Sequence, residues 1–291
     1  MRLAMKNISR VFDNGKTKHV VLENVGFTIG TGEFVTLLGP SGCGKTTLLN
    51  IIAGFLPATG GTITLNDALV TKPGPDRGFI FQDYALFPWM KVKDNILYPM
   101  KRLGVPKAER EERLGQLMAL AQLQGKENLY PHQLSGGMKQ RTAVIRALAA
   151  RPQVLLMDEP FGAVDFQMRM IMQEEMEALW LKDRTTVLMV THDVEEAIYL
   201  SDRVIVMSSD RGRILEDIRI DLPRPRQRKG DAYHHYEDRL IDLLKTALGT
   251  GPAEEARGDS RATVALASAA QCAAEYTGCA PQELAAMGER A

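Results

Sequence analysis

The sequence contains little cysteine, few aromatic residues, no excess of either charge and no long hydrophobic run. Its three cysteines, Cys43, Cys272 and Cys279, make no disulfide framework, which predicts a reducing compartment. The 36 lysines and arginines are balanced by 36 aspartates and glutamates, and because nucleic-acid binders usually carry a basic excess, we expect no nucleic-acid partner. No segment approaches the roughly 20 apolar residues that cross a bilayer, and the first residues lack a signal-peptide core. We therefore expect a soluble chain, so that any membrane-spanning part of its machinery belongs to another chain.

Strand and helix patterns alternate along most of the chain. LAMKNISRVF, VVLENVGFTI and EFVTLLG are short β-type runs separated by turn residues. Residues 92–150 have a helical pattern, and Pro106 opens one of its helices. Alternation on both sides of this block predicts an α/β fold with a mixed or parallel sheet covered on both faces and an inserted helical subdomain. The expected helices cover 45–55, 167–182 and 193–200, and the expected strands cover 62–65, 78–81, 154–157, 186–190 and 203–207.

The composition changes after Leu222. PRPRQRK, residues 223–229, predicts an extended solvated linker, with contact to an anionic lipid headgroup or an acidic partner as the alternative. Residues 233–248 fit one amphipathic helix, and 249–291, rich in Ala, Gly and Glu, fit weak helices. We expect a main domain over residues 1–222, a basic proline-rich linker over 223–230 and a helical or weakly structured extension over 231–291.

A glycine-rich junction between a strand and a helix is the strongest local signal. Residues 39–46, GPSGCGKT, fit the pattern G-x-x-x-x-G-K-[ST] between the strand EFVTLL and the helix TTLLNIIAGF. Glycines let backbone N–H groups converge on phosphate oxygens, and the helix N-terminus adds unpaired donors and a positive dipole. Lys45 would neutralise the β- and γ-phosphates and Thr46 would offer a hydroxyl to Mg²⁺; a chance glycine-rich turn is the alternative. The expected nucleotide-binding residues of this loop are Gly39, Pro40, Ser41, Gly42, Cys43, Gly44, Lys45, Thr46 and Thr47.

The thiol of Cys43 lies inside this loop. We therefore expect a bulky thiol reagent to inactivate the protein and ATP to protect it, with a buried, inert thiol as the alternative.

Two acids end an apolar strand in VLLMDE, residues 154–159. Asp158 would hold Mg²⁺ directly or through water, and Glu159, which faces a different way, would orient or deprotonate an attacking water. An apolar run ending in Asp-Glu is weak evidence by itself, but together with a phosphate loop it indicates nucleotide hydrolysis.

LSGGMKQR, residues 134–141, is a second helix N-terminus opened by glycines. Ser135 is a good N-cap, and a helix is expected to run on from Lys139 to Ala150. An ordinary capped helix is the alternative, but the order of phosphate loop, LSGG and apolar Asp-Glu favours a second anion-binding site.

In this order of motifs the chain resembles the ATP-binding subunits of ABC transporters over about residues 3–222. LSGGMKQR resembles the family signature, LSGGQ, which contacts nucleotide held by the opposite subunit. The resemblance implies a P-loop NTPase core with an N-terminal antiparallel β part, ATP and Mg²⁺ as cofactors, and a head-to-tail homodimer holding two ATP molecules. The signature residues that would act in trans are Leu134, Ser135, Gly136, Gly137 and Met138.

The resemblance gives roles to further residues. Phe12 lies where the family places an aromatic ring that stacks on adenine, and Gln82 matches the Q-loop glutamine that senses Mg²⁺ and water. Asp165, in GAVD, matches the D-loop acid, and His192 matches the switch histidine that contacts the γ-phosphate. Met138 replaces the usual signature glutamine, Phe12 replaces a commoner tyrosine and GAVD replaces SALD; because none of these removes a catalytic group, a competent ATPase is expected. The expected catalytic residues are Glu159, His192 and Gln82, and the expected metal ligands are Thr46, Gln82 and Asp158.

LFPWMKVKDNI and MDEPFGAVD resemble the importer branch that serves nitrate, sulfonates or taurine rather than sugar importers, which carry a long C-terminal β-domain. The resemblance implies a peripheral subunit at the cytoplasmic face of the inner membrane, with a membrane permease and a periplasmic or extracellular solute-binding protein as partners. The alternatives are another importer class, a soluble ABC ATPase acting on ribosomes or DNA, an exporter cassette, and a binding module with a vestigial ATPase. A single phosphate loop without sustained heptads argues against the soluble type, and the intact catalytic residues argue against the vestigial one.

Overall fold

The N-terminal strands form a small antiparallel sheet. The computed structural model describes residues 2–13, 15, 17–162 and 166–249 of the chain. The strands of this sheet are β1 (Arg2–Asp13), β2 (Lys18–Gly30), β4 (Gly60–Leu65) and β5 (Ala68–Leu69). Their order is β2-β1-β4-β5, and Met5 of β1 lies opposite both Phe27 and Ile63. The expected N-terminal antiparallel part is confirmed.

A second sheet has six strands in the order β10-β9-β3-β8-β7-β6. They are β3 (Phe34–Leu38), β6 (Arg77–Ile80), β7 (Val154–Asp158), β8 (Thr186–Thr191), β9 (Arg203–Met207) and β10 (Ile214–Arg219). The strands from β9 to β6 are parallel, and β10 is antiparallel to β9. Every residue of β3 and β8 is buried, as expected for strands covered on both faces. The predicted mixed sheet is confirmed.

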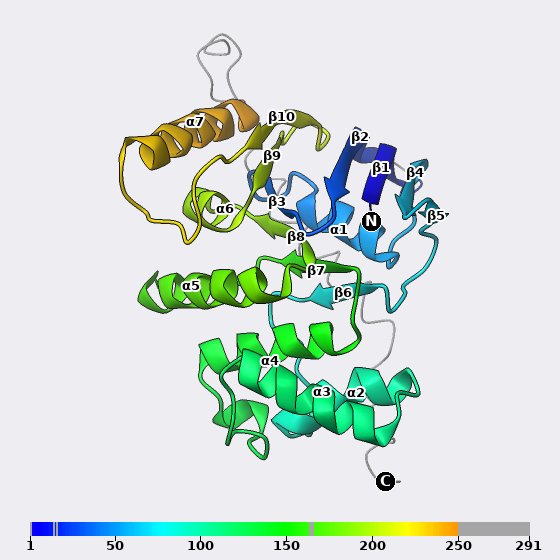
Figure 1. Cartoon of the computed structure of the whole chain (residues 1–291). Helices are drawn as coiled ribbons and strands as arrows, with labels where there is room; N and C mark the ends of the chain where they lie inside the picture. Colours follow the sequence, from blue (N-terminus) through cyan, green and yellow to red (C-terminus); the bar gives the residue numbers. More distant parts are fainter. Residues whose placement is uncertain (1, 14, 16, 163–165, 250–291) are drawn as a thin grey trace. The chain divides into compact units, whose positions relative to one another are not determined.

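Alternate residues of the central strands face opposite sides of this sheet. Val154 and Leu156 of β7 pack with α1 (Lys45–Ala53) and with the first sheet. Leu155 and Met157 pack with α4 (Gly136–Ala149) and α5 (Phe166–Asp183) on the other side. Figure 1 shows α1 and α4 on either side of β7 and β6. The helix after the phosphate loop and the helix after LSGG are therefore buried against opposite faces of one sheet.

The predicted helical block lies between β6 and β7 in the sequence. It contains α2 (Val92–Arg102), α3 (Lys107–Leu120), the short 3₁₀ helix η1 (Pro131–Gln133) and α4. Figure 1 shows α2, α3 and α4 grouped together below β6. Ile96 of α2 and Leu117 of α3 are fully buried in the same apolar cluster as α4 and the sheet. Helices over this part of the chain are thus confirmed.

Two helices, α6 (Val194–Leu200) and α7 (Asp231–Ala247), pack at the β9 end of the sheet. Tyr233 and Leu240 of α7 are buried in one cluster with Ala197 of α6 and Val204 of β9, so the helix predicted over 233–248 is present and packed. Within the described ranges, no helix has the length and apolar character needed to cross a bilayer. The domain boundaries expected at 222 and 230 stay predictions, and residues 250–291 lie outside the described part of the chain.

The solvated linker predicted over residues 223–229 is wrong for its three arginines, since Arg228 is also mostly buried and donates to Gln173 at 2.6 Å. Arg226 is only 5% exposed, and it donates to the Ile198 carbonyl at 2.5 Å and to the Ser201 carbonyl. Arg224 donates to Glu177 Oε1 at 2.9 Å. Burial lowers the pKa of Arg226 to about 10. Composition shows these cations but not the carbonyls and carboxylates that receive them, so the sequence could not predict this arginine strap, Arg224 and Arg226.

Candidate nucleotide-binding and hydrolysis site

The phosphate loop connects β3 to α1 and leaves no room for side chains at two of its glycines. A Cβ on Gly39 would lie 2.8 Å from the Met207 carbonyl oxygen, and one on Gly44 would lie 2.8 Å from Leu22 Cδ2. Gly44 also has φ +97°, a conformation that L-residues rarely adopt. The loop therefore needs glycine at both positions, and its backbone N–H groups stay unobstructed.

Lys45, the first residue of α1, lies across its own loop. Its side chain is almost fully buried, and Nζ donates to the carbonyls of Gly39 at 2.8 Å and Pro40 at 2.9 Å. The Cys43 Sγ lies 3.8 Å from the same Nζ and is buried. Burial raises the pKa of the Cys43 thiol, and Lys45 partly opposes this shift. The ammonium is therefore held against the carbonyls of its own loop.

Thr46 and Asp158 meet at the entrance to the loop. Thr46 Oγ1 donates to Asp158 Oδ1 at 2.9 Å. Burial raises the pKa of Asp158; the Thr46 hydrogen bond opposes this shift, and the neighbouring Glu159 carboxylate adds to it. A hydroxyl and a carboxylate are hard oxygen donors of the kind Mg²⁺ prefers. Among the described residues no group of three or more His, Cys, Asp or Glu could hold a metal, so these two side chains would supply only part of the coordination shell of an ion.

Glu159 and His192 lie at the ends of adjacent parallel strands. Asp158 of β7 pairs with Val190 of β8, so the residues that come next are neighbours. The Glu159 N–H donates to the Val190 carbonyl at 3.0 Å, and Glu159 Oε1 lies 3.3 Å from His192 Nδ1. Glu159 has φ +44°, a left-handed conformation that is uncommon for a residue other than glycine. A carboxylate and an imidazole therefore meet at this edge of the sheet.

Gln82 follows β6 at the same edge of the sheet. A Cβ on Gly162 would lie 3.4 Å from Gln82 Nε2 and 3.6 Å from Glu159 Oε2, so the amide and the carboxylate border one small residue. The segment after Gln82 is held by Asn95 of α2, which is fully buried, accepts from the Phe87 N–H at 2.9 Å and donates to the Met90 carbonyl at 3.0 Å. The sequence predicted Gln82 but missed Asn95, whose only signal is a polar residue on the buried face of a helix.

The signature residues open α4. Ser135 is its N-cap and is exposed; its Oγ accepts from the Met138 N–H at 3.4 Å. Gly137 is buried close to Met172 of α5, and Met138 is partly buried against the apolar cluster. Ser135 thus caps the helix as predicted, and its hydroxyl faces solvent.

The remaining predicted residues lie apart from the catalytic group. Phe12 ends β1 of the first sheet, and the Arg10 guanidinium lies 4.4 Å from its ring centroid. Asp165 of the D-loop lies outside the described residues. The structure therefore brings together Lys45, Thr46, Gln82, Asp158, Glu159 and His192. It places Ser135 on another helix and Phe12 in the other sheet.

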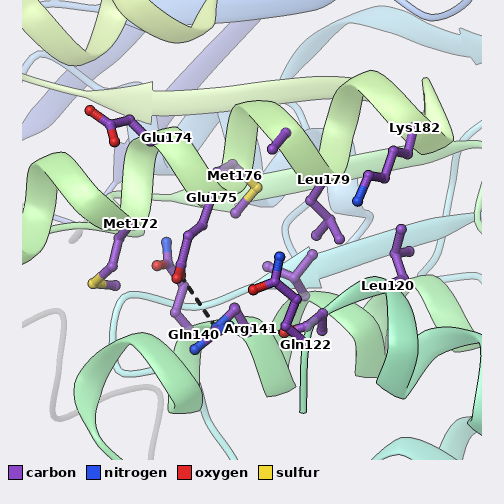
Figure 2. Close-up of a pocket in the computed structure, with 13 residues that line it drawn as sticks. Leu120, Gln122, Gln140, Arg141, Met172, Glu174, Glu175, Met176, Leu179 and Lys182 are labelled. Carbon is purple, nitrogen blue, oxygen red and sulfur yellow. Dashed lines mark hydrogen bonds and ion pairs between the residues drawn. The ribbon is translucent and has the colours of Figure 1, made fainter. Parts of the chain in front are cut away.

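A cavity lies away from the predicted catalytic and nucleotide-binding residues. Its volume is about 240 Å³, and Figure 2 shows it between the end of α3, α4 and α5, with the Arg141–Glu175 ion pair at 3.3 Å on its wall. The described residues that line it include Leu120, Met172 and Leu179, and none of the predicted catalytic or nucleotide-binding residues. The shape of the surface alone would not have located the hydrolysis site.

The chain is similar to proteins of one family along most of its length. The ABC transporter family model matches residues 22–162. The uncharacterized ABC transporter ATP-binding protein MJ0412 of Methanocaldococcus jannaschii is 44% identical over 84% of this chain and 92% of that protein. The nitrate import ATP-binding protein NrtD of Synechocystis is 42% identical, covering 84% of this chain and 96% of NrtD. The aliphatic sulfonates import ATP-binding protein SsuB of Bacillus cereus is 40% identical, covering 85% of this chain and all of that protein.

A solved structure agrees with these relatives. The post-hydrolysis dimer of the ATP-binding cassette MJ0796, bound to ADP and Pi, has a TM-score of 0.64 and 30% identity, and covers 75% of this chain and 98% of that one. The fold of this cassette is similar to the fold of the present chain. In the present chain the phosphate loop, Asp158, Glu159 and His192 lie at one edge of the sheet. The chain belongs to the ABC transporter family and is one of its ATP-binding subunits, an ATPase.

Proposed function

We propose that two copies of this chain form the ATP-driven motor of an importer for a small anionic solute, nitrate or a sulfonate such as taurine. The observation that carries the ATPase part is the Glu159–His192 contact of 3.3 Å beside the Thr46–Asp158 hydrogen bond of 2.9 Å. These four side chains gather the donors and the base that phosphoryl transfer to water needs. The importer part is supported by the names of the relatives and by the Q-loop sequence.

In the proposed site each residue has a defined task. The loop N–H groups and Lys45 would bind the phosphates, and Phe12 would stack on the adenine ring. Thr46, Asp158 and Gln82 would hold Mg²⁺, which when bound supplies positive charge to the terminal phosphates. Glu159 would take the proton of the attacking water, and His192, held on Glu159, would contact the γ-phosphate.

The second half of the site would come from another copy. α1 and α4 are buried against opposite faces of the sheet, and Ser135 is exposed. The solved cassette MJ0796 is a dimer. If two copies of this chain pair head to tail, Ser135 and Gly137 of one copy would reach the nucleotide on Lys45 of its twin. Asp165 would belong to the same contact. ATP drives closure only if it binds the closed pair more tightly than the open one.

The permease would dock beside the Q-loop. A groove of about 280 Å³ is lined by Trp89, Lys91, Tyr98 and Tyr130, among others, and the Trp89 side chain is largely exposed. An exposed aromatic residue beside cations suits a short helix of a partner with apolar and acidic side chains. The motor would then lie at the cytoplasmic face of the membrane, and a periplasmic or extracellular binding protein would deliver the solute.

The ATPase part is tested by Glu159→Gln, which keeps the size of the side chain and removes the base. Steady-state hydrolysis is expected to fall by on the order of 100-fold or more, while ATP still binds and the dimer remains closed. The matched control is Glu111→Gln on the exposed face of α3, which should hydrolyse ATP normally. Hydrolysis near the wild-type rate in Glu159→Gln would refute the role of this residue.

The importer part needs the whole complex. The chain is reconstituted with its permease and binding protein in vesicles, and ATP hydrolysis is measured with nitrate, taurine, alkanesulfonates and a sugar. Stimulation by one of the anions supports the proposed class, and stimulation by the sugar alone would replace it. Because the solute does not touch this subunit, these assays are more informative than any change in the chain itself.

A further inference from the structure

Both neighbours of His192 are held by hydrogen bonds from the first turn of α6. Thr191 Oγ1 donates to Glu196 Oε2 at 2.6 Å and accepts from the Asp193 N–H at 3.1 Å. Asp193 caps α6, since its Oδ1 accepts from the Glu196 N–H at 3.1 Å. Glu196 is 3% exposed and Thr191 is 2% exposed. The backbone on either side of His192 is thereby fixed.

A cation from another helix compensates these two acids. Arg169, in the first turn of α5, donates from Nη1 to Asp193 Oδ2 at 2.9 Å, and its Nε lies 3.8 Å from Glu196 Oε1. Burial raises the pKa of Glu196 to about 7, and Asp193 adds to this shift. The Thr191 hydrogen bond, Arg169 and His192 oppose it. Glu196 is buried, whereas Asp193 and Arg169 are partly exposed. Two ionised carboxylates this close repel each other, and the guanidinium between them compensates that repulsion.

We propose that Arg169 is a positioning residue for hydrolysis: it clamps Asp193 and Glu196 so that His192 stays in contact with Glu159. The inference rests on the proposed catalytic roles of Glu159 and His192. It goes beyond them because Arg169 lies on α5 and contacts Asp193 and Glu196 of the segment that carries His192. A displacement of the start of α5 is thereby transmitted to His192 through one side chain.

The test compares three arginine variants in steady-state ATP hydrolysis. Arg169→Met keeps the aliphatic stem and removes the cation, and its kcat is expected to fall about tenfold, because a catalytic group displaced by roughly 1 Å loses that much or more. Its affinity for a non-hydrolysable ATP analogue should stay within about twofold of wild type. Arg169→Lys restores a cation and should recover part of kcat. Arg228→Met is the matched control: Arg228 is a mostly buried arginine that donates to Gln173 and Glu174 of the same helix, and this variant should keep the wild-type kcat.

A double variant separates this role from a structural one. If Arg169 acts through His192, Arg169→Met should lower kcat by less than about twofold in a His192→Ala background. A tenfold loss that persists in that background, or a kcat of Arg169→Met equal to that of Arg228→Met, would overturn the positioning role. A wild-type kcat in His192→Ala alone would instead refute the proposed role of His192, and the inference would fall with it. The two failures are therefore distinguishable.

Discussion

The phosphate-loop end and the signature end of this chain are built in opposite ways. Lys45 is 4% exposed and bonded to its own loop, and Thr46 is bonded to Asp158. Ser135, by contrast, is exposed, and its hydroxyl accepts a long local hydrogen bond from the Met138 N–H of its own helix. The side chains of the first end are thus fixed by contacts within the chain, whereas the side chain of Ser135 is open to solvent. This difference between the two ends is expected if the exposed Ser135 of one copy completes the nucleotide site of a second copy.

The largest effect is expected when each end is broken in a different copy. Lys45→Ala removes the phosphate cation, and Ser135→Arg blocks the signature end; each alone should lower ATP hydrolysis by on the order of 100-fold. Randomly mixed subunits form heterodimers with one intact site, so the mixture should regain up to about a quarter of wild-type hydrolysis. A mixture no more active than either parent would contradict completion in trans.

The two ends should also differ in reactivity toward a thiol reagent. Cys43 is buried and its pKa is raised, which favours the inert alternative over the reactive thiol expected from the sequence. With Cys272 and Cys279 replaced by serine, Ser135→Cys should react with a maleimide on the order of 100-fold faster than Cys43. Mass spectrometry of the labelled peptides measures both rates. Similar rates at the two positions would mean that the loop opens readily.

The signature end can also be contrasted with α6, next to His192, because α6 contains a buried acid. The pKa of Glu196 is raised from 4.5 to about 7, so between these values the folded chain keeps a proton that the unfolded chain has lost. The free energy of unfolding should therefore fall as pH rises through this window, by at most roughly 3 kcal/mol. Glu196→Gln should flatten the fall in urea denaturation, and the exposed control Glu111→Gln should not. An unchanged slope in Glu196→Gln would assign the pH dependence to other groups.

The smallest effect is expected at Met138, where this chain departs from the family signature. Its side chain is partly buried against the apolar cluster, and the substitution leaves the side chain of Ser135 and the backbone of Gly137 in place. Met138→Gln should therefore change kcat by less than about twofold, measured as steady-state hydrolysis. A tenfold gain in kcat would show instead that Met138 limits the rate of hydrolysis.

Much of the fold could be predicted because its signals are local. Strands such as β7 and β8 are continuous apolar runs, and the phosphate loop has a fixed spacing between glycines and lysine, so their order already brings Lys45, Asp158 and His192 to one edge. The sequence of β10, ILEDIR, is a weak signal for a strand. Its inward-facing positions are Ile214, Glu216 and Ile218, so a charged residue interrupts the apolar alternation.

The contacts that could not be predicted join residues far apart in the sequence. Arg169 and Asp193 lie 24 positions apart, and Arg224 and Glu177 lie 47 apart. Composition shows that such charges exist but not which of them pair. Asp193 is followed three residues later by Glu196, a spacing typical of a capped helix, but this local pattern does not show that Arg169 pairs with both acids.

The arginine strap has a practical consequence for anyone who trims the polypeptide. Ending it at Leu222 would leave the Ile198 and Ser201 carbonyls and the buried Glu177 without their donors. Each uncompensated buried acceptor costs about 1–3 kcal/mol, a large part of the stability of a typical domain. A shortened version for crystallisation or reconstitution should therefore stop after Gly249, which retains the strap and α7.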